Sequence, residues 1–172
     1  MKILVVLLFP VLVLSQNKNN ADVFKAVRQG NLNELQQYVR VNTNIVDTLN
    51  NHNHSLLIIA AYYGQQSIIE YILPYATNLN HKSDNGTALA AAVVKNNLNI
   101  IRIFLKYKAN VNLTDANGIS PLMYAIMFKN IQVIKLLIKH GADIKLQDNT
   151  GKSTFEYAIA SGDQEIINLL KN

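Results

Sequence analysis

The chain has 172 residues, of which 49% are hydrophobic and 16% are charged, a balance that is typical of one globular domain and excludes a disordered chain. It has no cysteine, which excludes a disulfide framework, a thiolate nucleophile and a cysteine-ligated zinc. A formal net charge of +5 is too small to indicate a nucleic-acid-binding surface. Asparagine supplies roughly one residue in eight, which we interpret as a bias of genomic base composition.

The first residues have the pattern of a secretory signal peptide. Lys2 carries a positive charge, and an apolar run follows from Ile3 to Leu14. As a helix this run would rise about 18 Å, less than the ~30 Å hydrocarbon core of a bilayer. We therefore expect a signal peptide over residues 1–15, a polar lead over 16–20, and a mature protein that is periplasmic or secreted. The alternative is an uncleaved anchor; no later run is long enough to span a bilayer.

The rest of the chain repeats with a period near 33 residues. Apolar anchors recur at Val23, Leu57, Leu89, Leu122 and Phe155. The third residue after each anchor is an alanine, namely Ala26, Ala60, Ala92, Ala125 and Ala158. The seventh is Gly30, Gly64, Asn96, Lys129 or Gly162. Because the register holds five times, we predict five repeated units.

Each recurring residue has a physical role in a pair of helices. Ser120 is suited to cap a helix, and Pro121 is tolerated at its first position, where no backbone N–H is needed. Leu122 and Ala125 lie on one helix face, and the small alanine lets neighbouring helices approach closely. The seventh position takes the left-handed conformation that ends the first helix, at a cost of about 1 kcal/mol for Lys129. An apolar second helix follows, which in this unit ends at Gly141.

The stretch "DANGISPLMYAIMFKNIQVIKLLIKHGADIKLQ" (115–147) resembles an ankyrin repeat. The resemblance implies an all-α solenoid of stacked helix-turn-helix units joined by β-hairpin-like turns, with Gly118 and Gly151 in two of the turns. We expect an N-terminal capping unit at 21–49, repeats at 50–81, 82–114 and 115–147, and a C-terminal unit at 148–172. Met123 replaces the family's histidine, and Pro74 should shorten the second helix of its repeat.

No residues indicate catalysis, and we expect neither an enzyme nor a cofactor. His52 and His54 lie two residues apart near Asp47, but a metal would need further ligands, so we predict no metal site. Neither a nucleophile-elbow motif nor a phosphate-binding glycine loop is present. Asn53, Asn85 and Asn112 match the glycosylation pattern, which chance explains in an asparagine-rich chain.

The resemblance implies a protein-binding surface made of turn residues and of the two positions after the second alanine of each first helix. The predicted partner-binding residues are Tyr62, Tyr63, Val94, Lys95, Ala116, Asn117, Ile119, Met127 and Phe128. We expect Tyr63, Val94, Met127 and Phe128 to form one exposed apolar patch, the alternative being that part of this set packs into the core. Arg102, Lys106, Lys135 and Lys139 should form a basic stripe on the opposite side, either merely solvated or attractive to an acidic partner or anionic membrane.

These features predict a monomeric, non-catalytic interaction module of the bacterial envelope that binds, stabilises or inhibits another protein. An exported effector that acts on a host protein is the main alternative. An enzyme with an unrecognised site is a third.

Overall fold

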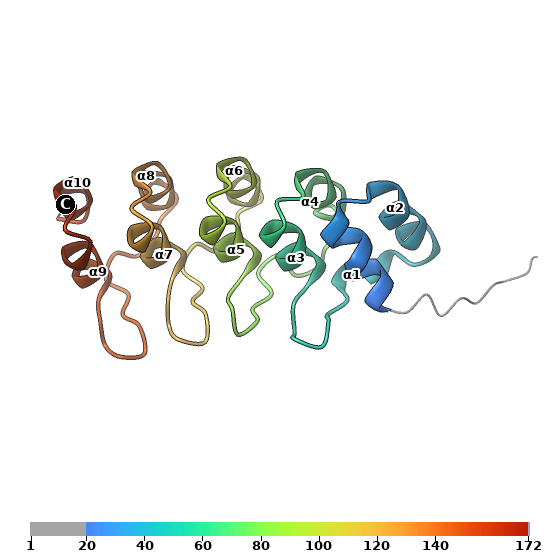
Figure 1. Ribbon diagram of the computed structural model, residues 1–172, viewed down its shortest axis with the longest axis horizontal. Helices are drawn as coiled ribbons and strands as arrows, with labels where there is room; N and C mark the ends of the chain where they lie inside the picture. Colours follow the sequence, from blue (N-terminus) through green and yellow to red (C-terminus); the bar gives the residue numbers. More distant parts are fainter. Residues whose placement is uncertain (1–19, 172) are drawn as a thin grey trace, which may run out of the picture.

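The computed structural model describes residues 20–171, so the expected signal peptide and residues 16–19 of the polar lead lie outside the described part. Helices come in pairs that stand side by side along one axis (Figure 1). The pairs are α1 (Asn20–Gln29) with α2 (Leu32–Val41), α3 (Leu56–Tyr62) with α4 (Gln66–Ile72), α5 (Ala88–Val94) with α6 (Leu98–Lys106), α7 (Pro121–Met127) with α8 (Ile131–Lys139), and α9 (Thr154–Ser161) with α10 (Gln164–Leu169). A short 3-10 helix, η1 (Thr43–Asp47), follows α2.

The first helices of successive pairs form one layer and the second helices another. In the first layer α3 packs between α1 and α5, and α7 packs between α5 and α9. In the second layer α4 packs against α2 and α6, and α10 packs against α8. This is the all-α solenoid that the sequence predicts, and the fold class is confirmed. No strand occurs within residues 20–171, where single β-bridges such as Leu49 with Ser55 close some of the loops.

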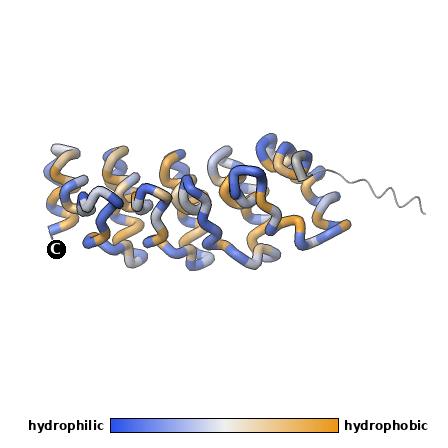
Figure 2. The backbone as a smooth tube through the Cα atoms, turned by 90° about the horizontal axis from the view of Figure 1, so that it is seen from below, coloured by the Kyte–Doolittle hydropathy of each residue, from blue (hydrophilic) through white to orange (hydrophobic). Residues whose placement is uncertain are grey.

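The repeated apolar positions build one continuous core. Every alanine three residues after an anchor is at most 1% exposed: Ala26, Ala60, Ala92, Ala125 and Ala158. Larger side chains such as Phe104 and Ile126 fill the space between the layers. Figure 2 shows hydrophobic stretches recurring in the helices and hydrophilic ones in the loops. Burial of this area is the main source of stability, because each unit alone is too thin to cover its apolar face.

Local signals set where the first helices begin and end. The residue before each of the helices α3, α5, α7 and α9 accepts a hydrogen bond from the third residue of its helix: Ser55, Thr87, Ser120 and Ser153. All five residues at the seventh position have positive φ, between 52° at Lys129 and 73° at Gly64, which confirms the predicted helix ends.

Pro74 also acts as predicted. The helix before it, α4, has 7 residues, whereas α6 and α8 have 9 each. No helix in the described residues is long and apolar enough to cross a membrane.

Candidate functional site

The C-terminal ends of α3 and α7 expose four large apolar or aromatic side chains. Tyr62 and Tyr63 are 48% and 50% exposed, and Met127 and Phe128 are 43% and 55% exposed. Each pair consists of the last residue of a first helix and the capping residue after it, where a side chain leaves the stack of helices. This placement is costly for a free protein, because apolar area stays in water, and it is typical of an interface.

The equivalent positions of α5 carry Val94, which is half-buried, and Lys95, which is exposed. The Lys95 ammonium lies 4.7 Å from the centre of the Tyr62 ring, a cation–π contact that joins two neighbouring repeats. Tyr62 in turn meets Tyr63 edge to face, with ring centres 5.4 Å apart. The structure therefore brings together three of the predicted residues through their side chains.

A groove with a volume of about 550 Å³ opens beside these residues, and we call it the inner groove. Its apolar part comes from three first helices: Ile58, Ile59, Tyr62 and Tyr63 from α3, Ala91 and Val94 from α5, and Tyr124 from α7. Its polar part comes from Arg28 of α1 and from Asn50, His52, His54 and Asn85 in the loops. A volume of this size is in the range of ordinary ligand pockets.

The residues of the expected patch differ in their relation to the inner groove. Tyr63 and Val94 line the inner groove, whereas Met127 and Phe128 do not. The Phe128 ring instead stacks on Tyr124, with centres 6.5 Å apart and planes within 10° of parallel. Since Tyr124 lines the groove, this stack connects the exposed end of α7 to it.

The loop histidines lie at one side of the inner groove. Burial, followed by the charges of His52 and His81, lowers the pKa of His54, so its ring is neutral at pH 7. The side-chain nitrogen of Asn85 lies 3.1 Å from Nε2 of His54. When the neutral ring carries its proton on Nδ1, Nε2 accepts a hydrogen bond from this amide. Asp47 is occupied elsewhere: its carboxylate accepts from the backbone N–H and hydroxyl of Thr77. Among residues 20–171 no group of three histidines or carboxylates is arranged to hold a metal ion.

The predicted turn residues lie in a loop that is hydrogen-bonded to the loops on both sides of it. Ala116 and Asn117 are exposed and Ile119 is half-buried. The backbone N–H of Ala116 donates to Asp84 O at 2.9 Å, and Asn117 O accepts from the N–H of Asn149 at 2.9 Å. Neighbouring loops are therefore tied together, which fixes the tips beside the inner groove.

Arg28 and Tyr124 line the groove but were not among the predicted residues. Both follow from the repeat register. Arg28 comes five residues after its anchor, as Tyr62 does, and Tyr124 comes two residues after its anchor, as Ile59 and Ala91 do. For Tyr124, as for Ile59 and Ala91, the signal that was missed is the position two residues after the anchor.

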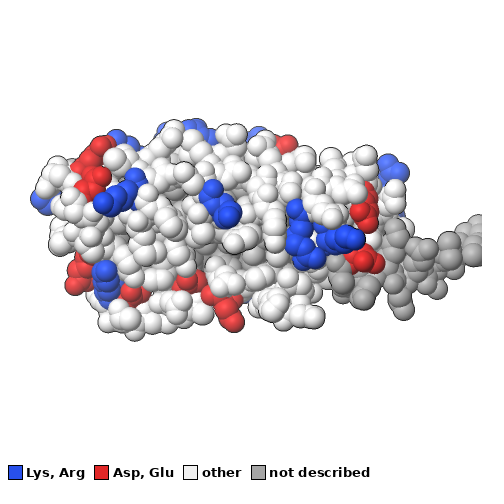
Figure 3. Space-filling view, in the orientation of Figure 1, with Lys and Arg blue, Asp and Glu red and all other residues white. Residues whose placement is uncertain are grey.

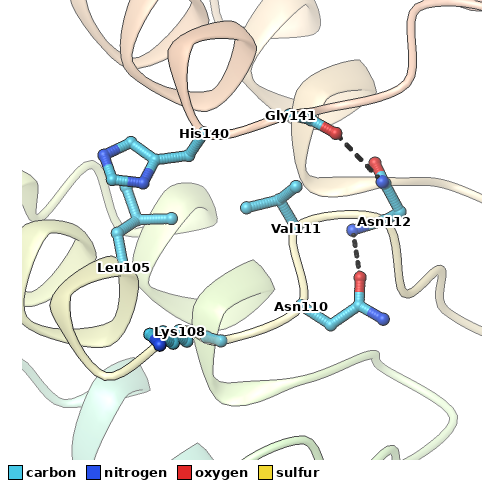
Figure 4. A pocket seen from close by; sticks show the side chains of 8 residues that line it. Leu105, Lys108, Asn110, Val111, Asn112, His140 and Gly141 are labelled. Carbon is cyan, nitrogen blue, oxygen red and sulfur yellow. Dashed lines mark hydrogen bonds between the residues drawn. The ribbon is translucent and has the colours of Figure 1, made fainter.

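A second, smaller cavity of about 310 Å³ lies where the loops after α6 and α8 meet (Figure 4). Asn112 is one of the residues that line it: its side-chain nitrogen donates to Gly141 O at 3.1 Å, and its backbone N–H donates to Asn110 Oδ1 at 2.9 Å. Both atoms of the Asn112 amide are used, because its oxygen also accepts from the N–H of Asp143.

The predicted basic stripe is exposed along α6 and α8. Lys135 forms an ion pair of 2.7 Å with Glu165 of α10, with both side chains 53% exposed. A pair so exposed contributes little to stability.

The family model that describes three copies of the ankyrin repeat matches residues 23–115 and, in a second match, residues 104–172. The chain is 26% identical over 105 residues to ankyrin repeat and SAM domain-containing protein 6 of Rattus norvegicus, which covers 60% of this chain and 12% of that protein. It is 31% identical over 81 residues to protein fem-1 homolog A-like of Mus musculus, covering 46% of this chain and 12% of that one. It is also 26% identical over 107 residues to the inactive serine/threonine-protein kinase TEX14 of Mus musculus, covering 62% of this chain and 7% of that one. The chain thus spans only a small part of the length of these relatives.

Ankyrin repeats generally serve as modules of protein–protein interaction and are typically not enzymes. The two family matches together cover residues 23–172. They agree with the stacked helix pairs and with the recurring anchors, alanines and left-handed helix ends. This chain belongs to the ankyrin-repeat family.

Proposed function

We propose that this protein is a monomeric, non-catalytic binding module that holds another protein against its inner face, by which we mean the inner groove together with Lys95, Met127, Phe128 and the tips at Ala116 and Asn117. The observation that carries the proposal is the exposure of Tyr62, Tyr63, Met127 and Phe128 at equivalent helix ends. Aromatic residues and methionine are enriched at the centres of protein interfaces, where burial on binding returns the free energy lost in water.

The rigidity of the face supports this function. The hydrogen-bonded caps fix where the first helices begin, and the tip at Ala116 is bonded to the loop at Asp84. Each pair of helices rests on its neighbours, so little conformational entropy is lost when a partner binds. Affinity then depends on how well the partner matches the exposed rings.

The leader-like sequence over residues 1–15 supports a place outside the cytoplasm. We propose that the mature chain acts in a bacterial envelope, where it binds, stabilises or inhibits its partner. Fractionation tests this location: retention in the envelope fits the proposal, whereas release into the medium favours an exported effector. N-terminal sequencing of the mature chain should begin at Gln16.

The binding function is tested by affinity capture of partners from the source organism, with quantitative mass spectrometry. Wild type, Tyr63→Ala and Phe128→Ala are compared, and Tyr107→Ala, which removes a ring that is 44% exposed after α6, serves as the matched control. We expect the partner to be reduced at least about tenfold by the first two changes and unchanged by the control. Equal recovery with folded Tyr63→Ala and Phe128→Ala variants would show that the inner face does not bind it.

A further inference from the structure

We infer that the inner groove receives an extended acidic segment of the partner protein, in which a carboxylate stands beside a large apolar side chain. This inference rests on the proposed function and specifies the chemistry of the partner. It is carried by an aliphatic floor with aromatic rings at its side, bordered by positive side chains that form no ion pair among the described residues.

The floor of the groove selects an apolar group. Ile58 and Ile59 are 5% and 7% exposed, so they form a closed bottom, while the rings of Tyr62 and Tyr63 rise at the side. The edge-to-face contact between the two rings holds their orientation. An aromatic or long aliphatic side chain gains most from such a surface, because it removes both its own area and that of the rings from water.

The border of the groove selects negative charge. Arg28 lines it and is exposed, and Lys95 stands over the Tyr62 ring. Within residues 20–171 the single ion pair is the one between Lys135 and Glu165, so neither Arg28 nor Lys95 has a carboxylate within 4.0 Å. Figure 3 shows Lys and Arg side chains spaced in a row across the middle of this face, with acidic side chains below the left part of the row and others beside its right-hand end.

The acidic groups near the groove lie outside its lining. No aspartate or glutamate is among the described residues that line it. Asp115, close to Tyr124, is only 4% exposed, and its carboxylate is held by the Tyr124 hydroxyl and two backbone N–H groups. Asp84 lies beside Asn85 at the loop tip and is not among the residues that line the groove, although its charge partly offsets the burial that lowers the pKa of His54, which lines the loop side.

Arg28 is positioned for this role by the next repeat. Its carbonyl oxygen accepts a hydrogen bond of 2.9 Å from the side chain of Gln65. The backbone that carries the guanidinium is therefore tied to the residue that precedes α4. A guanidinium can bind a carboxylate through two parallel hydrogen bonds, which makes it more selective than a lysine.

The proposal is tested by fluorescence anisotropy on the full chain with three labelled, end-blocked ten-residue peptides. The first alternates glutamate with phenylalanine and leucine. The second replaces each glutamate by glutamine, and the third replaces it by lysine. We expect the glutamate peptide to bind about five- to tenfold more tightly than the glutamine peptide at low salt, and the lysine peptide to bind most weakly.

Three variants locate the effect. Arg28→Gln should remove most of the preference for glutamate over glutamine, whereas Arg102→Gln, which removes an exposed charge from α6, should leave it intact. Tyr63→Ala should weaken the glutamate and glutamine peptides alike, because it removes apolar contact only. Circular dichroism shows that each variant is folded.

The inference is overturned if no peptide binds, if glutamate and glutamine peptides bind equally, or if the preference survives Arg28→Gln. Equal binding of the two peptides with loss in Tyr63→Ala would reject the acidic partner while leaving the inner face as a binding surface. The proposed function has its own negative result. It is rejected if folded Tyr63→Ala and Phe128→Ala variants capture the whole partner protein as well as wild type does.

Discussion

The hydroxyl of Tyr124 on α7 donates a hydrogen bond of 2.6 Å to Oδ2 of Asp115, the residue that opens the loop before that helix. The other carboxylate oxygen of Asp115 accepts from the backbone N–H groups of Asn117 and Ile119. One buried aspartate thus holds the turn and the helix in a fixed relation. Tyr157 and Asp148 repeat the arrangement at 2.6 Å in the last unit.

Replacement of Tyr124 by phenylalanine should destabilise the protein by about 1–2 kcal/mol, because the buried Asp115 carboxylate loses a charge-assisted hydrogen bond. The measurement is urea unfolding followed by circular dichroism. Tyr107→Phe is the matched control, since that ring is exposed, and it should change the free energy of unfolding by less than about 0.5 kcal/mol. Equal effects of the two changes would mean that the bond contributes nothing.

Asp148, the aspartate of the second pair, should make the stability of the protein fall at low pH. Hydrogen bonds from the hydroxyls of Tyr157 and then Thr150 lower the pKa of Asp148 to about 2 from its ordinary 3.8. Because the folded chain binds this proton less tightly than the unfolded chain, the contribution is present above about pH 4 and is lost as the pH falls towards 2. Melting temperatures between pH 7 and pH 2 should fall less steeply for Asp148→Asn than for wild type; parallel curves would contradict this origin.

Alkaline titration should detect the tyrosines of the same two Tyr–Asp pairs, because their hydroxyls ionise at unusually high pH. Burial, together with the hydrogen bond to the aspartate, raises the pKa of both Tyr124 and Tyr157 to about 12 from 10.0. Their contribution to stability is complete below about pH 10 and is lost as the pH rises through 12. Absorbance at 295 nm should show late-ionising tyrosines, and Tyr157→Phe should remove one of them. An unchanged late phase in that variant would be the contrary result.

The sequence predicted the fold because its signals are local and repeated. A serine or threonine before a helix and a glycine after it act on their own unit, so their spacing alone marks the helix ends. Asn96 and Lys129 have φ of 53° and 52°, although only their register indicated this. Each copy of the pattern is a weak signal, but its recurrence five times was enough to predict the architecture.

Contacts between units could not be predicted in the same way. The amide of Asn80 accepts from the backbone of Asn110, and the amide of Asn112 bonds to the loop at Gly141 and Asp143. Such bonds depend on how closely neighbouring loops approach, which no spacing within one unit reveals. The asparagine-rich composition, interpreted first as genomic bias, thus has a structural use as well.

The candidate site was predicted in part for a related reason. The register identified helix-end positions such as Tyr62 and Tyr63 but not which residues meet across repeats. Arg28 was overlooked because it lies in the N-terminal capping unit, and Tyr124 because it lies one helical turn before Phe128. Whether the predicted residues bind a partner stays a prediction until the experiments above are done.

The bonds between loops should matter for stability. Asn112→Ala removes two side-chain hydrogen bonds to the next unit and should destabilise the protein by about 1 kcal/mol, since the site is only partly buried. Asn99→Ala, on an exposed position of α6, is the control and should be close to neutral. Urea unfolding measures both. If Asn112→Ala is as stable as the control, water replaces these bonds without loss.

The two glycines that end α1 and α3 should differ in their tolerance of a side chain. Gly30 and Gly64 have φ of 69° and 73°, so alanine at either costs about 1 kcal/mol from backbone strain. At Gly64 the new methyl group would meet only the Asn97 side chain, at 3.6 Å, an ordinary contact. At Gly30 it would collide with the end of the Gln65 side chain and displace the hydrogen bond from Gln65 to Arg28 O. We therefore expect Gly30→Ala to be less stable than Gly64→Ala by about another 1 kcal/mol in urea unfolding. Measured against Gln65→Ala alone, the double change Gln65→Ala with Gly30→Ala should cost only the backbone strain of about 1 kcal/mol, because the colliding side chain and its hydrogen bond are already gone. A cost of about 2 kcal/mol in that comparison would place all of the strain in the backbone.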